Sequence, residues 1–212
     1  AGLSAAVTLH DLGLEVVVLE KMPMIGGNTV RAEGGINAAE TPQQKKAGIP
    51  DTIDQFYADT MKGGHNLNDP ALVRTLTTHA KDAVAWLVSL GADLNTVGRA
   101  GGAKYPRAHR PTDGSAIGPE VIRVLWKAAK DRKMDVRTQT RATEIIMKDG
   151  RVAGVKATTK DGKVYTIDAK AVVLATGGFG ANQDMLVKYQ PKLKGYATTN
   201  QPGATGDGII LA

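Results

Sequence analysis

The hydrophobic pattern at the start of the chain predicts a helix followed by a buried strand. Residues 1–13 (AGLSAAVTLHDLG) place small and apolar side chains at helical spacing, and Gly13 stands where the end of a helix favours glycine. The run EVVVLE in residues 15–20 lacks polar alternation, which is typical of a strand buried on both faces of a parallel sheet. A glycine-rich loop follows over residues 21–35.

Amphipathic patterns then predict further helices before residue 134. Asp51 is expected to cap the first of them. Asp69 and Pro70 supply an N-cap and a first-turn proline for the second, which Gly91 ends. The Gly- and Pro-rich residues 98–116 predict a long ordered loop. The predicted helices cover residues 51–64, 69–91 and 118–133.

The pattern changes to strand-like alternation after residue 133. Asp-Gly pairs at 149–150 and 161–162 predict tight turns, so we expect a small antiparallel β-meander there. The run KAVVLATGGFG in residues 170–180 predicts a return to a buried strand of the main sheet. The chain should therefore have an α/β, Rossmann-like fold with a parallel sheet plus the β-meander. The expected parts are residues 1–133, 134–169 and 170–212.

Composition removes several classes of function. None of the 212 residues is a cysteine, which excludes disulfides, thiolate catalysis and cysteine metal sites, and the histidines show no metal-ligand spacing. The net charge is +6, but the densest basic cluster, residues 127–133 (KAAKDRK), lies on a predicted helix. We interpret it as a solvated helix face and expect no nucleic-acid partner, because only 4% of the residues are aromatic and could stack on bases. No apolar run reaches the length of a membrane span.

The acid at the end of the first strand raises the possibility of a dinucleotide site. Such sites place a pyrophosphate at a helix N-terminus and a carboxylate on the ribose roughly 20 residues after the glycine loop. Gly2 opens the first predicted helix and Glu20 ends the next strand, so the spacing fits. The strand and first glycines of a full G-x-G-x-x-G fingerprint are not in this sequence. From this pair alone, an exposed strand-end glutamate is an equally good interpretation.

The loop after Glu20 carries a more specific resemblance. GGNTVRAEGGINAAET (26–41) resembles the FAD-binding loop of the fumarate reductase and succinate dehydrogenase flavoprotein family. Further motifs resemble the soluble flavocytochrome-type fumarate reductases and urocanate reductases, and they follow the family's order along the whole chain. These motifs are DTMKGGHNLNDPALV, LVSLGADLNTVG, RAHRPTDGSAIG, AVVLATGGFG and TTNQPGATGDG.

The resemblance implies a Rossmann-like FAD-binding domain and a set of cofactor contacts. In the family, the position of Gly34 also borders the substrate, Glu20 matches the ribose acid, and Asp207 matches an acid that binds FAD hydroxyls. Taken alone, Asp207 is almost equally well explained as a cap of the helix that follows it. The implied contacts are Ala1, Gly2, Glu20, Lys21, Gly26, Gly27, Asn28, Thr29, Ala32, Gly34, Gly35, Ala142, Ala175, Thr176, Gly177, Gly178 and Asp207.

Asn28 distinguishes two branches of the family. Membrane-bound succinate dehydrogenases carry a histidine at this position that is covalently bonded to the flavin. This sequence has asparagine, as the soluble reductases do. A side-chain amide can donate and accept hydrogen bonds but cannot form the histidyl–flavin bond, so we predict non-covalent FAD.

The resemblance also implies an activity. Members reduce the C=C bond of an α,β-unsaturated carboxylate, fumarate or urocanate, by hydride transfer from flavin N5, and they draw electrons from a haem, FMN or other donor module. Their proton-donor and carboxylate-binding residues lie in a capping domain and a C-terminal stretch, neither of which is in this sequence. We therefore assign no catalytic residue and expect this chain alone to be inactive. Relatives of this type are often bacterial and exported, and a periplasmic or cytoplasmic location stays open.

Both chain ends resemble interior positions of a domain, so we expect that the chain belongs to a longer protein or is completed by other segments of an assembly. His109 and Arg110 form a basic pair in a loop that the family places near the flavin. We expect them to hold that loop by hydrogen bonds.

Two other functions remain open. One is a related flavin dehydrogenase or oxidase that runs in the reverse direction, of the 3-ketosteroid dehydrogenase or aspartate oxidase type. The other is a non-catalytic FAD-binding fragment. A plain NAD dehydrogenase fits less well because the loop after Glu20 resembles flavin proteins, and no serine lies in the nucleophile elbow that a hydrolase would need.

Overall fold

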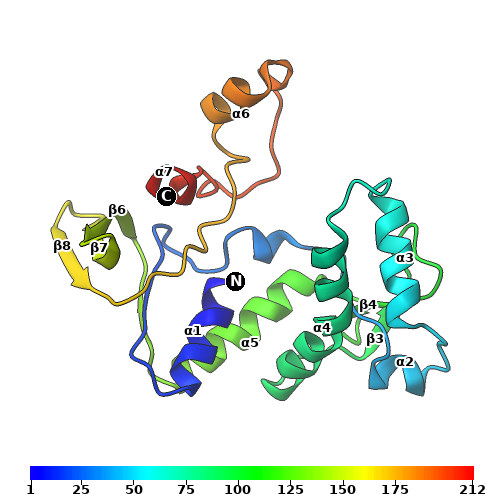
Figure 1. Cartoon of the computed structure of the whole chain (residues 1–212). Helices are drawn as coiled ribbons and strands as arrows, with labels where there is room; N and C mark the ends of the chain where they lie inside the picture. The colour runs from blue at the N-terminus through cyan, green and yellow to red at the C-terminus, as the bar shows by residue number, and fades with distance from the viewer. The chain divides into compact units, whose positions relative to one another are not determined.

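A computed structural model describes residues 1–212, and the chain divides into two units. Unit 1 consists of residues 1–31 and 125–212, and unit 2 consists of residues 32–124. The division falls inside helix α5 (Ile117–Asp131), whose two ends belong to different units. Figure 1 traces the elements in chain order.

Unit 1 holds a parallel strand pair and an antiparallel sheet. Strand β1 pairs in parallel with β5, with Val18 opposite Val136. The second sheet has the order β6-β7-β8 and is antiparallel throughout. Besides part of α5, the elements are α1 (Gly2–Asp11), β1 (Val17–Leu19), the 3₁₀ helix η1 (Gly27–Arg31), β5 (Asp135–Arg137), β6 (Thr140–Lys148), β7 (Arg151–Thr159), β8 (Val164–Asp168), α6 (Gln183–Tyr189), the 3₁₀ helix η2 (Pro191–Leu193) and α7 (Asp207–Leu211).

The predicted meander is present, with one change at its start. Asp149 and Gly150 have φ values of 51° and 73°, the left-handed pair that a tight β6–β7 hairpin requires. Gly162, with φ 85°, lies in the β7–β8 turn. Residues 135–137 were expected to join this antiparallel stretch, but they pair in parallel with β1 instead. The antiparallel sheet therefore begins at Thr140.

The predictions of fully buried strands were wrong in two places. Residues 170–176 form no strand, and Val173 and Leu174 are 60% and 41% exposed. In β1, Val17 is 38% exposed. A parallel strand becomes buried on both faces only when it is flanked by other strands and covered by helices. Within residues 1–212, β1 has a single neighbour and residues 170–176 have none.

Unit 2 is built from helices around a small antiparallel sheet of order β2-β4-β3. Its central strand β4 lies within residues 98–116, which were predicted as loop. Leu94, at 0% exposure, and Val84, at 1%, belong to the apolar core of this unit. Besides part of α5, the elements are β2 (Ile36–Asn37), α2 (Pro42–Lys46), α3 (Ile53–Gly63), α4 (Pro70–Ser89), β3 (Thr96–Gly98) and β4 (Ala108–Arg110).

Helix capping follows the prediction for α4 but not for α3. The Asp69 carboxylate accepts hydrogen bonds from the backbone N–H groups of Ala71 and Leu72, and Pro70 occupies the first turn. The cap of α3 is Thr52, whose hydroxyl oxygen accepts from the backbone N–H of Gln55 at 3.0 Å. The prediction of Asp51 as this cap was wrong, because its side chain points to a buried arginine described below.

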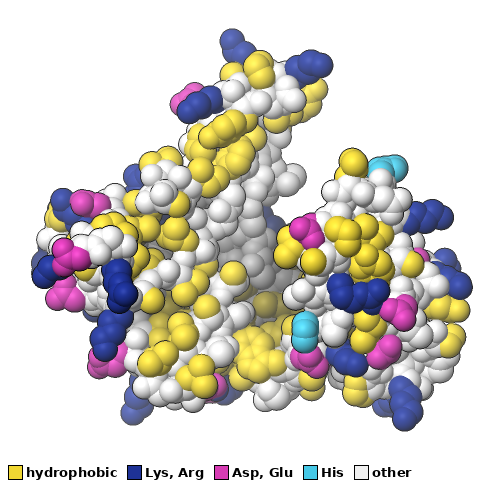
Figure 2. Space-filling view, in the orientation of Figure 1, with side chains coloured by type: hydrophobic (Ala, Val, Ile, Leu, Met, Phe, Trp, Pro, Cys, Tyr) yellow, Lys and Arg dark blue, Asp and Glu magenta, His cyan; other side chains and the backbone are white.

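The surface gives two further observations. On the face in Figure 2, Lys and Arg side chains are scattered among the other types. No helix is long and apolar enough to serve as a membrane span.

Candidate functional site

The first turn of α1 meets residue 175 in unit 1. A methyl group added to Gly2 would lie 3.3 Å from the Cβ of Ala175, so the glycine allows a close approach. Ala1 is the N-cap and offers no side-chain hydrogen bond to the first turn. The N-terminal N–H groups of this ten-residue helix are therefore available to an anionic group, which suits a pyrophosphate.

Glu20 directly follows β1 and uses one of its two carboxylate oxygens in a hydrogen bond within the chain. Its backbone N–H donates to the carbonyl of Arg137 on β5 at 2.9 Å. Its Oε1 accepts from the backbone N–H of Met22 at 2.8 Å, while Oε2 has no partner within the chain. The local turn thus orients the half-buried carboxylate and leaves one oxygen to accept from a ligand hydroxyl.

Asp207 lies in a cluster with two cations of unit 1. Its carboxylate accepts from Lys21 Nζ at 3.0 Å, from Arg141 Nε at 3.1 Å and from the Thr205 hydroxyl at 2.8 Å. Burial alone would raise the pKa of Asp207, but the hydrogen bonds from Thr205 and Lys21, the charge of Lys21 and the hydrogen bond from Arg141 hold that pKa below its ordinary value. Asp207 is therefore ionised at neutral pH, and the cluster joins the end of β1 to β6, where Ala142 follows Arg141.

The alternative role of Asp207 as a helix cap is not what the structure shows. The N-cap of α7 is Gly206, which has φ 81° and offers no side chain. The N–H of Gly208 instead donates to the hydroxyl oxygen of Thr176 at 3.1 Å. Thr176 thus holds α7 in place and leaves the Asp207 carboxylate free for its cations.

The loop of Gly26, Gly27, Asn28 and Thr29 is a tight turn that opens η1. Gly26 and Gly27 have φ values of 115° and 51°, which favour glycine whatever the ligand. The N–H of Thr29 closes the turn on the carbonyl of Gly26 at 3.0 Å. The side-chain amide of Asn28 is already engaged: Nδ2 donates to Asn200 Oδ1 at 2.5 Å, and Oδ1 accepts from the N–H of Gln201 at 2.7 Å.

Two of the remaining predicted glycines are required by the backbone of this chain, and two others are not. Gly177 has φ 73°, and a methyl group on Gly35 would lie 2.9 Å from the His109 carbonyl oxygen in β4. Gly177 is favoured by its left-handed backbone conformation, and Gly35 is favoured because a side chain would clash with β4. By contrast, a methyl group on Gly34 in unit 2, or on Gly178 in unit 1, would meet no atom within 4 Å.

The bare backbones at Gly34 and Gly178 border open space, and such backbones admit a close ligand. Within unit 1, the backbone of Gly178, the helix N-terminus at Gly2 and the carboxylates of Glu20 and Asp207 offer the donors and acceptors that a dinucleotide requires. The residues present therefore fit FAD. Of the remaining predicted residues, Ala32 uses its carbonyl to accept from Gly118 N–H at 2.8 Å. The individual FAD contacts stay predictions.

His109 and Arg110 lie in β4, not in a loop, and they hold the neighbouring segments by hydrogen bonds, as expected. The Nδ1 of His109 lies 2.9 Å from the Arg107 carbonyl and 3.1 Å from the Ile36 carbonyl, and Nε2 lies 2.8 Å from the Thr41 hydroxyl. Since Nδ1 faces carbonyl oxygens, it carries the ring proton. Burial lowers the pKa of His109, so the ring is neutral and structural. Arg110 Nη2 donates to the carbonyl of Glu33 at 2.5 Å.

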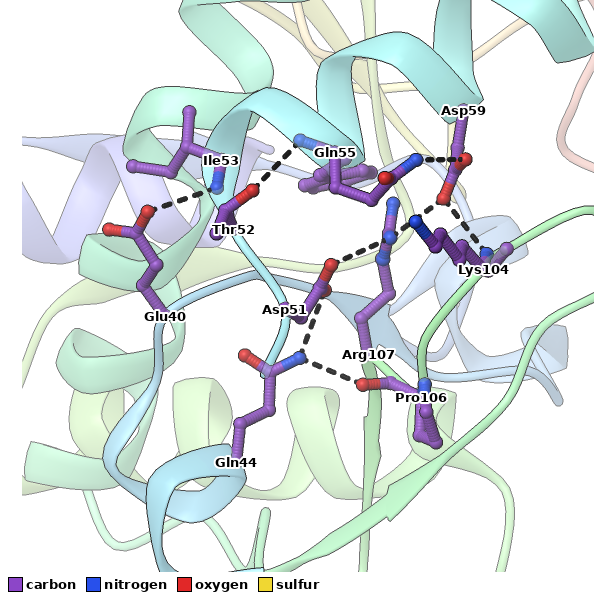
Figure 3. Close-up of polar contacts among 12 residues, drawn as sticks. Glu40, Gln44, Asp51, Thr52, Ile53, Gln55, Asp59, Lys104, Pro106 and Arg107 are labelled. Atoms are coloured by element: carbon purple, nitrogen blue, oxygen red, sulfur yellow. Dashed lines mark hydrogen bonds and ion pairs between the residues drawn. The ribbon is translucent and has the colours of Figure 1, made fainter. Parts of the chain in front are cut away.

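Unit 2 also contains a buried ionic network that local sequence rules missed (Figure 3). Arg107 Nη2 lies 2.8 Å from Asp51 Oδ1 and 2.8 Å from Asp59 Oδ2. Gln44 Nε2 donates to Asp51 Oδ2 at 3.1 Å and to the Pro106 carbonyl at 2.8 Å. The network ties α2 and α3 to the residues that precede β4. Its two acids, Asp51 and Asp59, lie 56 and 48 residues from Arg107 along the chain, so no local pattern signals the ion pairs.

A hollow of about 680 Å³ lies beside this network in unit 2. Its walls come from α3 and from the turn that contains Gly101 and Gly102. Three cations, Lys62, Arg99 and Lys104, line it. None of the residues predicted to contact FAD is among its lining residues.

The chain is similar to known proteins along its whole length. Residues 1–212 match the family model described as an FAD binding domain. The chain is 48% identical over 213 residues to a fumarate reductase (cytochrome) of Shewanella frigidimarina, covering 100% of this chain and 37% of that protein. It is 36% identical over 218 residues to a urocanate reductase of Eggerthella lenta, covering 100% of this chain and 36% of that protein.

A solved structure shares the fold. The open conformation of a flavocytochrome c3 fumarate reductase superposes with a TM-score of 0.95 at 41% identity, over 99% of this chain and 37% of that one. The chain thus spans a little over a third of the length of these relatives. The predicted α/β fold and the resemblance to flavocytochrome-type fumarate reductases and urocanate reductases are confirmed.

Proposed function

Because this chain belongs to the family of FAD binding domains, we propose that it is the flavin-binding portion of an oxidoreductase that reduces the C=C bond of an α,β-unsaturated carboxylate. Fumarate and urocanate, the compounds in the names of two relatives, both belong to this class. The chain spans 37% of the fumarate reductase and 36% of the urocanate reductase, so the activity is proposed for the complete protein.

One observation carries the proposal: unit 1 combines an uncapped helix N-terminus at Ala1 with two oriented carboxylates. The N-terminus suits the pyrophosphate of FAD. Glu20, with Oε2 unpartnered, can accept from ribose hydroxyls. Asp207, held ionised by Lys21 and Arg141, can accept from further hydroxyls of the cofactor.

When bound, FAD supplies hydride transfer from flavin N5 to the β-carbon of the substrate. The contribution of this chain is to bind and orient the cofactor, and the bare backbone of Gly34 leaves room for a substrate. The imidazole of His109 is buried and its nitrogens are hydrogen-bonded within the chain, so it moves no proton to the substrate. We propose that proton donation and carboxylate binding come from parts of the protein outside these residues, so this chain alone is inactive.

FAD is held without a covalent bond in this proposal. Asn28 stands where covalent relatives use histidine, and an amide nitrogen does not attack the flavin ring. Intact-mass measurement of the flavin-loaded protein after denaturation should return the polypeptide mass alone. A mass increased by one flavin would contradict this part of the proposal.

A haem-containing module is the proposed electron donor. Support comes from the names of two similar proteins, one a fumarate reductase (cytochrome) and the other a flavocytochrome c3. If such a module is present, dithionite should reduce haem bands in the visible spectrum of the complete protein, and fumarate or urocanate should reoxidise them. Haem bands that stay reduced while the flavin reoxidises would rule out this electron path.

The activity is tested in the complete protein with reduced methyl viologen as electron source. Fumarate or urocanate should accelerate viologen oxidation, and the saturated carboxylate should accumulate in a 1:1 ratio with the enoate consumed. Retained FAD without viologen oxidation by any enoate would favour a non-catalytic FAD-binding protein. Flavin reduction by a saturated substrate would favour a dehydrogenase that runs in the reverse direction.

A further inference from the structure

Residues 198–207, here called the docked segment, lie against the two glycine loops of unit 1 that are predicted to contact FAD. On one side, Arg31 Nη1 donates to the Thr199 carbonyl at 3.1 Å. On the other side, Gly206 N–H donates to the Gly178 carbonyl at 3.1 Å, and Ala181 N–H donates to the Ala204 carbonyl at 2.9 Å. The docked segment therefore joins the loop at 26–31 to the loop at 178–182.

Asn28 makes the most specific of these connections. Its Nδ2 donates to Asn200 Oδ1 at 2.5 Å, and its Oδ1 accepts from the backbone N–H of Gln201 at 2.7 Å. The Asn28 amide thus donates to one residue of the docked segment and accepts from the next. A side chain with only a donor or only an acceptor cannot make both bonds as they stand.

The other face of Asn200 is also constrained. Its Nδ2 donates to the Thr198 hydroxyl at 2.8 Å, which sets the orientation of the amide toward Asn28. A methyl group on Gly180 would lie 2.2 Å from Asn200 Nδ2, so the last glycine of the GGFG motif makes room for this amide. Asn28, Asn200 and Gly180 therefore belong to one fitted contact within unit 1.

We propose that Asn28 is a positioning residue that acts on the cofactor site through Asn200 and Gln201. The inference rests on the proposed FAD-binding function. By fixing Gln201, Asn28 holds the chain that leads to Asp207, whose carboxylate is the predicted acceptor for cofactor hydroxyls. The bonds that Nδ2 and Oδ1 make within the chain fix the orientation of the Asn28 amide toward the docked segment.

The test uses the flavin-binding protein and its variants Asn28→Leu, Asn28→Asp and Asn200→Ala. Asn28→Leu removes both bonds. Asn28→Asp keeps the acceptor for Gln201 N–H and loses only the donor to Asn200. Asn95→Ala is the control, because it deletes an exposed asparagine whose amide donates only to Asp93.

Two readouts are compared: limited proteolysis within residues 198–207 of the flavin-free protein, and the FAD dissociation constant from fluorescence quenching. We expect Asn28→Leu and Asn200→Ala to increase cleavage in the docked segment and to weaken FAD binding roughly tenfold, the effect of about one or two hydrogen bonds. Asn28→Asp should weaken FAD binding at least as much as Asn200→Ala, because it loses the same bond and places a carboxylate oxygen beside Asn200 Oδ1. The double variant Asn28→Leu/Asn200→Ala should be no weaker than Asn28→Leu alone, because both act through one contact.

Three other outcomes would contradict the proposal or the proposed function. If Asn28→Leu weakens FAD binding while the docked segment stays protected and Asn200→Ala has no effect, Asn28 is a direct ligand and the proposal is wrong. If neither readout changes, the contact has no role in the site, and the proposal is equally wrong. If the unmodified protein binds no FAD, the proposed function fails, while cleavage in the flavin-free variants still tests whether Asn28 holds the docked segment.

Discussion

The buried pair of Arg107 and Asp51 should contribute far more to stability than an exposed pair of the same geometry. In the substitution Arg107→Leu, Asp51 and Asp59 lose their counter-charge while their side chains stay 0% and 15% exposed. Removing one partner of a buried ion pair leaves an uncompensated charge, which costs about 3–5 kcal/mol. Arg107 also stacks on Phe56, with its guanidinium carbon 4.8 Å from the ring centre.

Arg74→Leu is the matched control for this substitution. Arg74 pairs with Asp54 at 2.7 Å and stacks on Tyr57 at 4.0 Å, but the two charged side chains are 46% and 87% exposed. An exposed ion pair contributes about 0–1 kcal/mol, and an exposed cation–π contact about 0.5–1 kcal/mol. The two arginines thus differ mainly in burial.

Urea unfolding followed by circular dichroism measures both free energies of unfolding. We expect a loss for Arg107→Leu that exceeds the loss for Arg74→Leu by about 2 kcal/mol or more. Asp51→Asn should fall between them, because the amide offers one acceptor where the carboxylate offered two. Equal losses for the two arginine variants would refute the reasoning, since burial would then have no effect on the value of the pair.

Two further predictions concern the glycines and the acid cluster. Gly34→Ala meets no atom within 4 Å, so the midpoint of urea unfolding should stay unchanged while FAD affinity falls; Gly35→Ala, 2.9 Å from the His109 carbonyl, should cost about 1–3 kcal/mol of stability. Equal stabilities of the two variants would contradict the distinction. The pKa of Asp207 is lower in the folded chain than its ordinary value of 3.8, so its ion pairs stabilise the fold above that pH and are lost as pH falls through the folded-state pKa. Asp207→Asn should therefore flatten the decline of urea midpoints below about pH 4, and an unchanged decline would argue against the cluster.

Features encoded by neighbouring residues were predictable from the sequence. The Asp149-Gly150 hairpin and the Asp69-Pro70 helix start depend on backbone conformations that a few residues determine. The cofactor motifs resemble those of known flavoproteins because close backbone approach requires specific residue types in a specific order. These features were found without reference to distant parts of the chain.

Features that depend on distant partners were not predictable. Asp51 satisfies the local rule for a helix cap, but Arg107, 56 residues away, provides a stronger partner for a buried carboxylate. The amide of Asn28 bonds to residues more than 170 positions away, and no local pattern signals those bonds. The apolar run at 170–176 carries the composition of a buried strand, yet burial requires flanking strands that residues 1–212 do not supply there.

Flavin retention tests the central claim most directly. The protein is mixed with FAD, freed of unbound ligand by gel filtration, and examined by visible spectroscopy before and after acid precipitation. The account predicts a yellow protein that releases its flavin into the supernatant. A folded but colourless protein would contradict the claim that these residues hold FAD, and flavin that stays in the precipitate would contradict the claim that it is held without a covalent bond.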